Sequence, residues 1–172
     1  MYRKKAEEMG TLLAEQGKTL VYGGGNVGLM KSVADAALAK GGKVIGVIPR
    51  RLRELELAHP GLSECYVTES MHERKLLMNK LSDGFIALPG GWGTLEEISE
   101  AVTWTQLNYQ EKPTGILNTK KYYDPLLDWL KQASHEGFIS KEHIDLLVVE
   151  TDPKRLLERM AKTVYPRLEQ HL

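Results

Sequence analysis

The sequence contains a single cysteine, Cys65, among 172 residues. One thiol cannot form an internal disulfide, and nothing in the cysteine usage points to an oxidising compartment. The five histidines are scattered along the chain, so no spacing typical of a metal site is present. We therefore expect a protein of the reducing cytosol that binds no metal.

An excess of charge of either sign is also absent, because 23 lysines and arginines balance 23 aspartates and glutamates. A chain without net charge has no general attraction for a polyanion. Nucleic acid and anionic membrane surfaces are therefore disfavoured as principal partners. We expect the ligand to be a small molecule.

Long apolar runs are missing as well. Runs such as 44–48 and 85–88 are far shorter than the roughly 20 residues that a membrane-spanning helix needs. Residues 1–8 carry charges of both signs and no apolar stretch, which is not typical of a secretory signal. We expect no transmembrane helix and a cytoplasmic location.

What the chain does contain is a regular alternation of short β-rich runs and longer helical stretches, without a Ser- or Pro-rich linker. The expected strands cover residues 19–22, 43–48, 65–68, 84–88, 114–117 and 146–149. The expected helices cover residues 3–16, 28–40, 71–82, 95–109, 124–136 and 154–163. The strands are nearly continuous apolar runs, which is typical of strands buried on both faces. The alternation predicts a single doubly wound, Rossmann-like α/β domain over residues 1–172, with a mainly parallel sheet.

Doubly wound domains usually open with a strand, whereas the first expected element here is a helix. We therefore expect the sequence to lack its first strand. Ligands of such sheets bind outside the carboxyl ends of the strands, so functional residues are sought in the loops that follow strands.

The first such loop lies between an expected strand and an expected helix, and Gly23, Gly25 and Gly28 match the spacing G-x-G-x-x-G. Backbone amides and the helix dipole favour an anion there, which predicts a phosphate loop at Gly23, Gly24 and Gly25. A dinucleotide enzyme would also need an acid at the end of the next strand. That position holds 48–51, Ile-Pro-Arg-Arg, which disfavours NAD and leaves NADP open. The alternative is a tight turn whose glycines only allow close packing.

The second loop, residues 88–97, reads Leu-Pro-Gly-Gly-Trp-Gly-Thr-Leu-Glu-Glu and is the more specific signal. Its three glycines expose consecutive amides, so the loop could surround a ribose phosphate with an acid beside it. Thr94 and Glu97 also have the spacing of a capping box, in which the glutamate bonds back to the amide of the cap. Glu96 gains the usual first-turn benefit from the helix dipole. The residues alone leave both interpretations of Glu97 open.

An arginine interrupts the apolar face of the helix expected over residues 71–82. Met71, Arg74, Met78 and Leu81 share one face at spacings of three and four. A half-buried arginine needs a carboxylate or a phosphate as partner, and Glu97 or a ligand phosphate could serve. The alternative is an arginine whose stem covers the core while its head reaches water.

Two other classes of site find no support. No G-x-S-x-G elbow indicates an acyl-transfer triad. Aromatic side chains are more often core residues than stacking platforms, and Trp92 is the exception because it lies inside a glycine loop. An adenine ring could stack on it.

These motifs together resemble a known family. Residues 71–75, Met-His-Glu-Arg-Lys, followed by 89–97 are similar to the paired signature of the LONELY GUY family of cytokinin riboside 5′-monophosphate phosphoribohydrolases. The similarity runs from 22–25 through 101–104 to 136–139, nearly the whole chain. Members have also been labelled lysine decarboxylases, but this sequence offers no clear site for a pyridoxal phosphate Schiff base, and no cofactor is expected.

The resemblance implies hydrolysis of the N-glycosidic bond of a purine nucleoside monophosphate, with release of the base and ribose 5-phosphate, and leaves AMP open as a further substrate. It implies that Arg74 and Glu97 carry the chemistry. It also implies a set of substrate-binding residues: Glu56, Lys75, Gly91, Trp92, Gly93, Thr94, Leu95, Glu96 and Thr103. Members commonly form homodimers, and they begin with a strand and a Gly-Ser-Ser loop that this sequence does not contain.

Breaking the bond develops positive charge on the sugar, which a fixed carboxylate such as Glu97 would stabilise while it orients or deprotonates water. Arg74 would either hold the phosphate or keep Glu97 ionised. A hypothesis from another class remains beside this one: a non-catalytic nucleotide-binding or sensing module that holds AMP, a related nucleotide or NADP.

Overall fold

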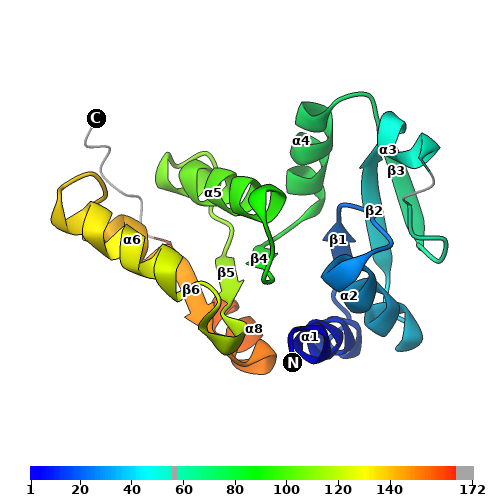
Figure 1. The fold of residues 1–172 in the computed structure, drawn as a ribbon, viewed down its shortest axis with the longest axis horizontal. Helices are drawn as coiled ribbons and strands as arrows, with labels where there is room; N and C mark the ends of the chain where they lie inside the picture. The colour runs from blue at the N-terminus through cyan, green and yellow to red at the C-terminus, as the bar shows by residue number, and fades with distance from the viewer. Residues whose placement is uncertain (56–57, 166–172) are drawn as a thin grey trace. The chain divides into compact units, whose positions relative to one another are not determined.

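The computed structural model describes residues 1–55 and 58–165, and its chain divides into two compact units with the boundary between Ser82 and Asp83 (Figure 1). Both units are built of parallel strands alternating with helices. Each unit has its own three-stranded sheet and its own cluster of buried apolar side chains.

Outside residues 56–57, the first unit contains three strands and four helices. In chain order they are α1 (Tyr2–Glu15), β1 (Leu20–Tyr22), α2 (Gly28–Ala39), β2 (Val44–Pro49), α3 (Arg50–Glu54), β3 (Glu64–Thr68) and α4 (Met71–Leu81). The sheet order is β1-β2-β3, with Val21 opposite Ile45 and Ile48 opposite Val67. All six residues of β2 are buried, as expected for the middle strand of a covered sheet.

The core of this unit lies between α2 and the sheet. Tyr22, Ala34, Ala37 and Val44 form a buried cluster. On β3, by contrast, Cys65 and Tyr66 are exposed, so the expectation that every strand is buried on both faces is wrong for this one. The reason is its place at the edge of the sheet, where it has a neighbouring strand on one side among the described residues.

The second unit repeats the same plan. Its elements are β4 (Phe85–Ala87), α5 (Trp92–Gln106), β5 (Thr114–Leu117), the short 3-10 helix η1 (Thr119–Lys121), α6 (Asp124–His135), α7 (Lys141–Ile144), β6 (Leu147–Glu150) and α8 (Pro153–Met160). The sheet order is β4-β5-β6, all parallel, and β5 is buried along its whole length. Ala87, Ile98, Ile116 and Tyr123 form its buried cluster.

The predicted α/β fold with parallel strands is confirmed, and all six expected strands and six expected helices are present with ends shifted by a few residues. The elements α3, η1 and α7 are additional; each spans five residues or fewer and shows no apolar period long enough to read. The single domain over residues 1–172 stays a prediction. Within the described part of the chain, no helix has the length and apolarity required to cross a bilayer.

Candidate functional site

Both glycine loops lie where a strand ends and a helix begins. The first follows β1 and leads into α2, and the second follows β4 and leads into α5. Neither helix start is capped by a side chain, whereas Ser70 caps α4 and Asp152 caps α8. The cap residues of α2 and α5 therefore supply no side-chain acceptor to the first-turn amides. An anionic ligand could supply that acceptor.

The first glycine loop is held in shape from two directions. The Tyr22 hydroxyl donates to the carbonyl oxygen of Gly25 at 3.2 Å. The amide of His59 donates to the carbonyl oxygen of Gly24 at 2.8 Å, and Ala58 forms an isolated antiparallel bridge with Gly25. Gly24 has a φ of 74°, a conformation that glycine adopts without strain.

Arg74 lies against this loop. Its Nε donates to the carbonyl oxygen of Val47 at 3.0 Å, and its Nη1 lies 3.9 Å from the Met71 sulfur. Its Nη2 lies so close to Gly23 that a Cβ on Gly23 would overlap it. The half-buried guanidinium is thus held at the carboxyl ends of β1 and β2, rather than extended away from the protein.

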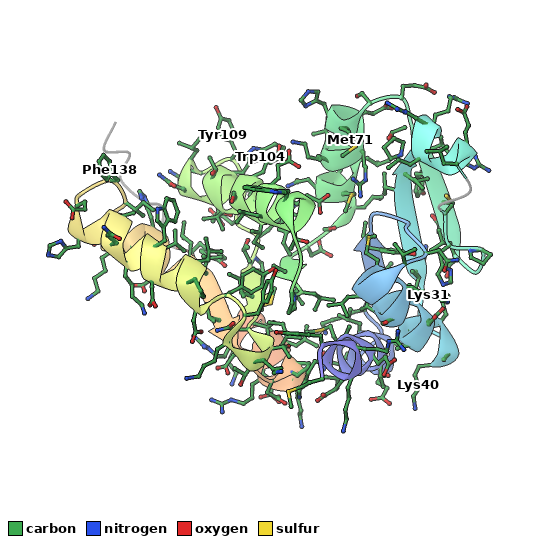
Figure 2. All side chains as sticks on the ribbon, viewed as in Figure 1. Lys31, Lys40, Met71, Trp104, Tyr109 and Phe138 are labelled. Atoms are coloured by element: carbon green, nitrogen blue, oxygen red, sulfur yellow. The ribbon has the colours of Figure 1, made fainter. Side chains whose placement is uncertain are left out.

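The apolar face predicted around Arg74 is only partly buried. No residue of α4 is fully buried, and Met71, in the first turn of this helix, is an exposed side chain (Figure 2). Met78 and Leu81 are half-buried. The hydrogen bond to Val47 on β2 and the close approach to Gly23 therefore position Arg74 without full burial in a core.

The start of α5 corrects the capping box predicted for the second loop. The helix begins at Trp92 with Gly91 in the cap position, because the amide of Leu95 donates to the Gly91 carbonyl oxygen at 3.0 Å and closes the first turn there. Thr94 is consequently inside the helix and cannot be its cap. Glu97, half-buried one turn further on, is not the third residue after a capping threonine. The interpretation of Glu97 as the partner of a Thr94 cap is wrong.

Thr94 instead lies against the loop itself. A Cβ on Gly90 would overlap the Thr94 hydroxyl oxygen, so this loop position requires glycine. The close approach fixes the first turn of α5 relative to the glycines that precede it. The backbone amides of this loop therefore keep a constant spacing.

Two adjacent tyrosines, which the sequence interpretation missed, hold the second loop from the neighbouring strand end. The Tyr122 hydroxyl donates to the Gly90 carbonyl oxygen at 2.8 Å, and the Tyr123 hydroxyl donates to the Leu88 carbonyl oxygen at 2.6 Å. Their rings meet edge to face with centroids 5.0 Å apart. Burial raises the pKa of Tyr123 to about 12, so its hydroxyl stays a donor at ordinary pH. Both tyrosines follow β5. Their position after the carboxyl end of a strand, where functional residues are expected, is the signal that could have identified them.

Replacement of Tyr123 by phenylalanine tests this anchor. The change leaves the Leu88 carbonyl oxygen without its donor next to the buried cluster, and we expect a loss of about 1–2 kcal/mol in the free energy of unfolding. The matched change Tyr122→Phe should cost less, because this side chain is exposed and water can replace the lost donor. Denaturant unfolding of both variants gives the comparison, and equal losses would contradict this account.

The remaining predicted residues are spread over both units. Lys75 follows Arg74 on α4 and is half-buried, while Trp92 is 87% exposed at the start of α5. Glu96 and Thr103 are exposed and, being seven residues apart, lie on the same face of α5. The Thr103 hydroxyl donates to the Ser99 carbonyl oxygen of its own helix at 2.8 Å.

Three further predicted residues behave differently. The side chain of Leu95 packs against the buried cluster of the second unit, so any contact with a ligand would have to come from its backbone. Gly93 is exposed and has open space where a Cβ would lie. Glu56 lies outside the described residues.

One residue of the first loop was also missed. Asn26 follows the three glycines, and its side-chain oxygen is buried without a hydrogen-bond partner among residues 1–55 and 58–165. A buried acceptor of this kind normally finds a donor in the protein, in water or in a ligand. No local pattern distinguishes this asparagine from an ordinary loop residue.

The chain is similar to several known proteins. The family model described as possible lysine decarboxylase matches residues 30–160. A cytokinin riboside 5′-monophosphate phosphoribohydrolase of Rhodococcoides fascians is 50% identical over 140 residues, which cover 81% of this chain and 71% of that protein. A protein of the same activity from Arabidopsis thaliana is 44% identical over 168 residues, 98% of this chain and 78% of its own.

A solved structure shows the same fold. The molybdenum cofactor binding protein from the phototrophic bacterium Rippkaea orientalis matches with a TM-score of 0.70 and 25% sequence identity, over 93% of this chain and 86% of that one.

Proposed function

Because the chain belongs to the LONELY GUY family of cytokinin riboside 5′-monophosphate phosphoribohydrolases, we propose that it hydrolyses the N-glycosidic bond of these nucleotides. The products are the free purine base and ribose 5-phosphate. The observation that carries the proposal is 44% identity to a phosphoribohydrolase over 98% of the chain. The glycine loop before α5 and the position of Glu97 in that helix add a physical basis.

In this proposal Arg74 holds the substrate phosphate together with Gly23, Gly24 and Gly25. The contact of its guanidinium with Gly23 supports this role over that of a group that only keeps Glu97 ionised. The Nε of Arg74 bonds to Val47, and the Nη groups of the same planar guanidinium are donors of the kind that pair with phosphate oxygens. Arginine suits such pairing because its donors form a rigid planar fork.

Glu97 is the acid that acts at the sugar. As the bond to the base breaks, the ribose ring takes on oxocarbenium character, and a carboxylate beside the anomeric carbon stabilises that charge. The same carboxylate orients a water molecule and accepts its proton as the water oxygen bonds to the anomeric carbon. The departing base takes up a proton, so that the elements of water are divided between the sugar and the base. The start of α5 at Trp92 supports this role, because the capping function that would otherwise explain Glu97 is not used.

The other residues of the proposed site bind the nucleotide without taking part in bond breaking. They are Glu56, Lys75, Gly91, Trp92, Gly93, Thr94, Leu95, Glu96 and Thr103. The exposed indole of Trp92 offers a face on which a purine could stack. We extend the proposal to AMP as a second substrate and to a homodimer in the cytoplasm, as the family resemblance implies.

Chromatography of the reaction products, together with calorimetric binding of the same nucleotides, separates this proposal from a non-catalytic nucleotide-binding module. We expect isopentenyladenosine monophosphate and AMP to bind and both to release free base, whereas the corresponding nucleosides without phosphate should be poor substrates. Binding without release of base would favour the sensing module. Light scattering on the same preparation reports the oligomeric state.

A further inference from the structure

The three consecutive residues Gly23, Gly24 and Gly25 need external support to keep one shape. Glycine loses more conformational freedom on ordering than any other residue, so a glycine loop without outside contacts would sample many conformations. A ligand that binds such a loop must order it, which weakens binding. The contacts that fix this loop therefore bear on how tightly it holds a phosphate.

Much of that support comes from the segment 58–61. Ala58 forms the bridge with Gly25, and the His59 amide bonds to the Gly24 carbonyl oxygen at 2.8 Å. The His59 residue itself is only 7% exposed. Burying a polar ring costs free energy unless both nitrogens have hydrogen-bond partners. The partners of this imidazole therefore show which segments it connects.

Both ring nitrogens are paired. Nδ1 accepts the amide hydrogen of Gly61 at 3.1 Å, and Nε2 lies 2.8 Å from Oδ1 of Asp35 on α2. Because the Gly61 amide can only donate, Nδ1 must carry a lone pair, and Nε2 then carries the hydrogen and donates to Asp35. The imidazole thus links its own segment to the helix that the glycine loop leads into.

The Asp35 side chain is a carboxylate that can accept this hydrogen bond. Its other oxygen, Oδ2, accepts from Lys31 Nζ at 2.7 Å along the same helix, where Figure 2 labels Lys31. The hydrogen bonds from Lys31 and then from His59 hold the pKa of Asp35 below its ordinary value, so the side chain is an ionised acceptor at neutral pH.

We infer that the His59–Asp35 pair is a clamp that positions the first glycine loop for the phosphate of the substrate. The loop is followed by α2 and bridged by segment 58–61, and the clamp joins these two flanking elements. His59 and Asp35 act as positioning residues and need not touch the substrate. The inference rests on the proposed function in one respect only, namely that the glycine loop binds the phosphate.

The test uses Asp35→Ala and His59→Ala in the whole chain, with Asp35→Asn as the conservative variant, because asparagine keeps an oxygen that can accept from Nε2. Loss of the bond should raise KM for isopentenyladenosine monophosphate about tenfold and leave kcat within about threefold. The inhibition constant of ribose 5-phosphate should rise in parallel, while that of adenine should not change. Asp35→Asn should restore values near those of the wild type.

Hydrogen exchange of the peptide that covers residues 22–28 gives a readout that does not depend on activity. We expect faster exchange in both alanine variants and wild-type exchange in Asp35→Asn. The matched control is Ser63→Ala, which removes the hydroxyl that accepts from the Val44 amide at 3.0 Å in the same unit, whereas the hydrogen bonds that Tyr22 and His59 make to the loop do not involve Ser63. It should alter stability without altering KM or exchange in residues 22–28.

The exposed Asp35 side chain makes Asp35→Ala the decisive variant if His59→Ala does not fold. Unchanged exchange in Asp35→Ala, or faster exchange with an unchanged KM and an unchanged inhibition constant for ribose 5-phosphate, would overturn the inference. A wild-type protein that releases no base would overturn the proposed function instead. In that event, exchange and calorimetric binding of ribose 5-phosphate still decide whether the clamp positions a phosphate loop.

Discussion

Glu97→Gln should lower kcat for a cytokinin riboside 5′-monophosphate by about a thousandfold and leave the Kd of the nucleotide within about threefold. Glutamine has nearly the same shape as glutamate but carries no negative charge and cannot accept a proton from water. The charge that develops on the ribose would then lack its stabilising carboxylate. Single-turnover base release and calorimetric binding measure the two quantities separately.

The control for this variant is Glu111→Gln, an identical change at an exposed glutamate outside the proposed site. It should leave both kcat and Kd unchanged. A second substitution, Glu97→Ala, addresses the structural alternative. If Glu97 served only to stabilise the start of α5, Glu97→Ala would lower the free energy of unfolding by about 0.5–2 kcal/mol and turnover would persist. The helix start at Trp92 argues against that outcome.

Gly23→Ala and Arg74→Lys should each lower kcat/KM by about a hundredfold or more, because the first displaces the guanidinium from the first glycine loop and the second removes it. The alanine Cβ would overlap Nη2 of Arg74, so either the arginine or the backbone of β1 and its loop must move. Lysine keeps the positive charge but loses the bond from Nε to Val47 and the planar pairing with phosphate. Steady-state kinetics with the nucleotide and inhibition by ribose 5-phosphate measure the effect.

Arg3→Lys, an exposed position on α1, is the matched control for the arginine change and should have wild-type kinetics. Thermal unfolding of Gly23→Ala shows whether the fold survives. A folded Gly23→Ala variant with wild-type affinity for ribose 5-phosphate would contradict the placement of the phosphate beside Arg74.

The order of strands and helices could be predicted because it depends on local patterns. The apolar runs of β2 and β5 predicted strands buried on both faces, and both are buried throughout. The exposed edge strand β3 was not recognised, because burial depends on which strands become neighbours and a single apolar run does not reveal this. The start of α5 was misplaced for a related reason: three glycines suggested a longer loop, whereas the backbone is already helical at Trp92.

The functional side chains also divide into those with an unusual local pattern and those whose role depends on distant contacts. Arg74 and Glu97 stood out because an arginine in an apolar stripe and an acid after a glycine loop are unusual in their local context. His59 and Tyr123 did not, because their roles depend on distant partners. His59 bonds to a residue 24 positions away in the sequence, and Tyr123 bonds to one 35 positions away. Such contacts exist only in the folded chain, and a buried histidine or tyrosine has no distinctive local pattern. Supporting residues are therefore harder to predict than the residues they support.

The most direct test of the central claim is the stoichiometry of products from isopentenyladenosine monophosphate, measured side by side for the wild-type protein and Glu97→Gln. We predict that the wild-type protein releases one molecule of free base and one of ribose 5-phosphate for each nucleotide consumed, and that the variant binds the nucleotide but releases almost none. A folded wild-type protein that binds the nucleotide and leaves it intact, or a variant that turns over at the wild-type rate, would contradict the account.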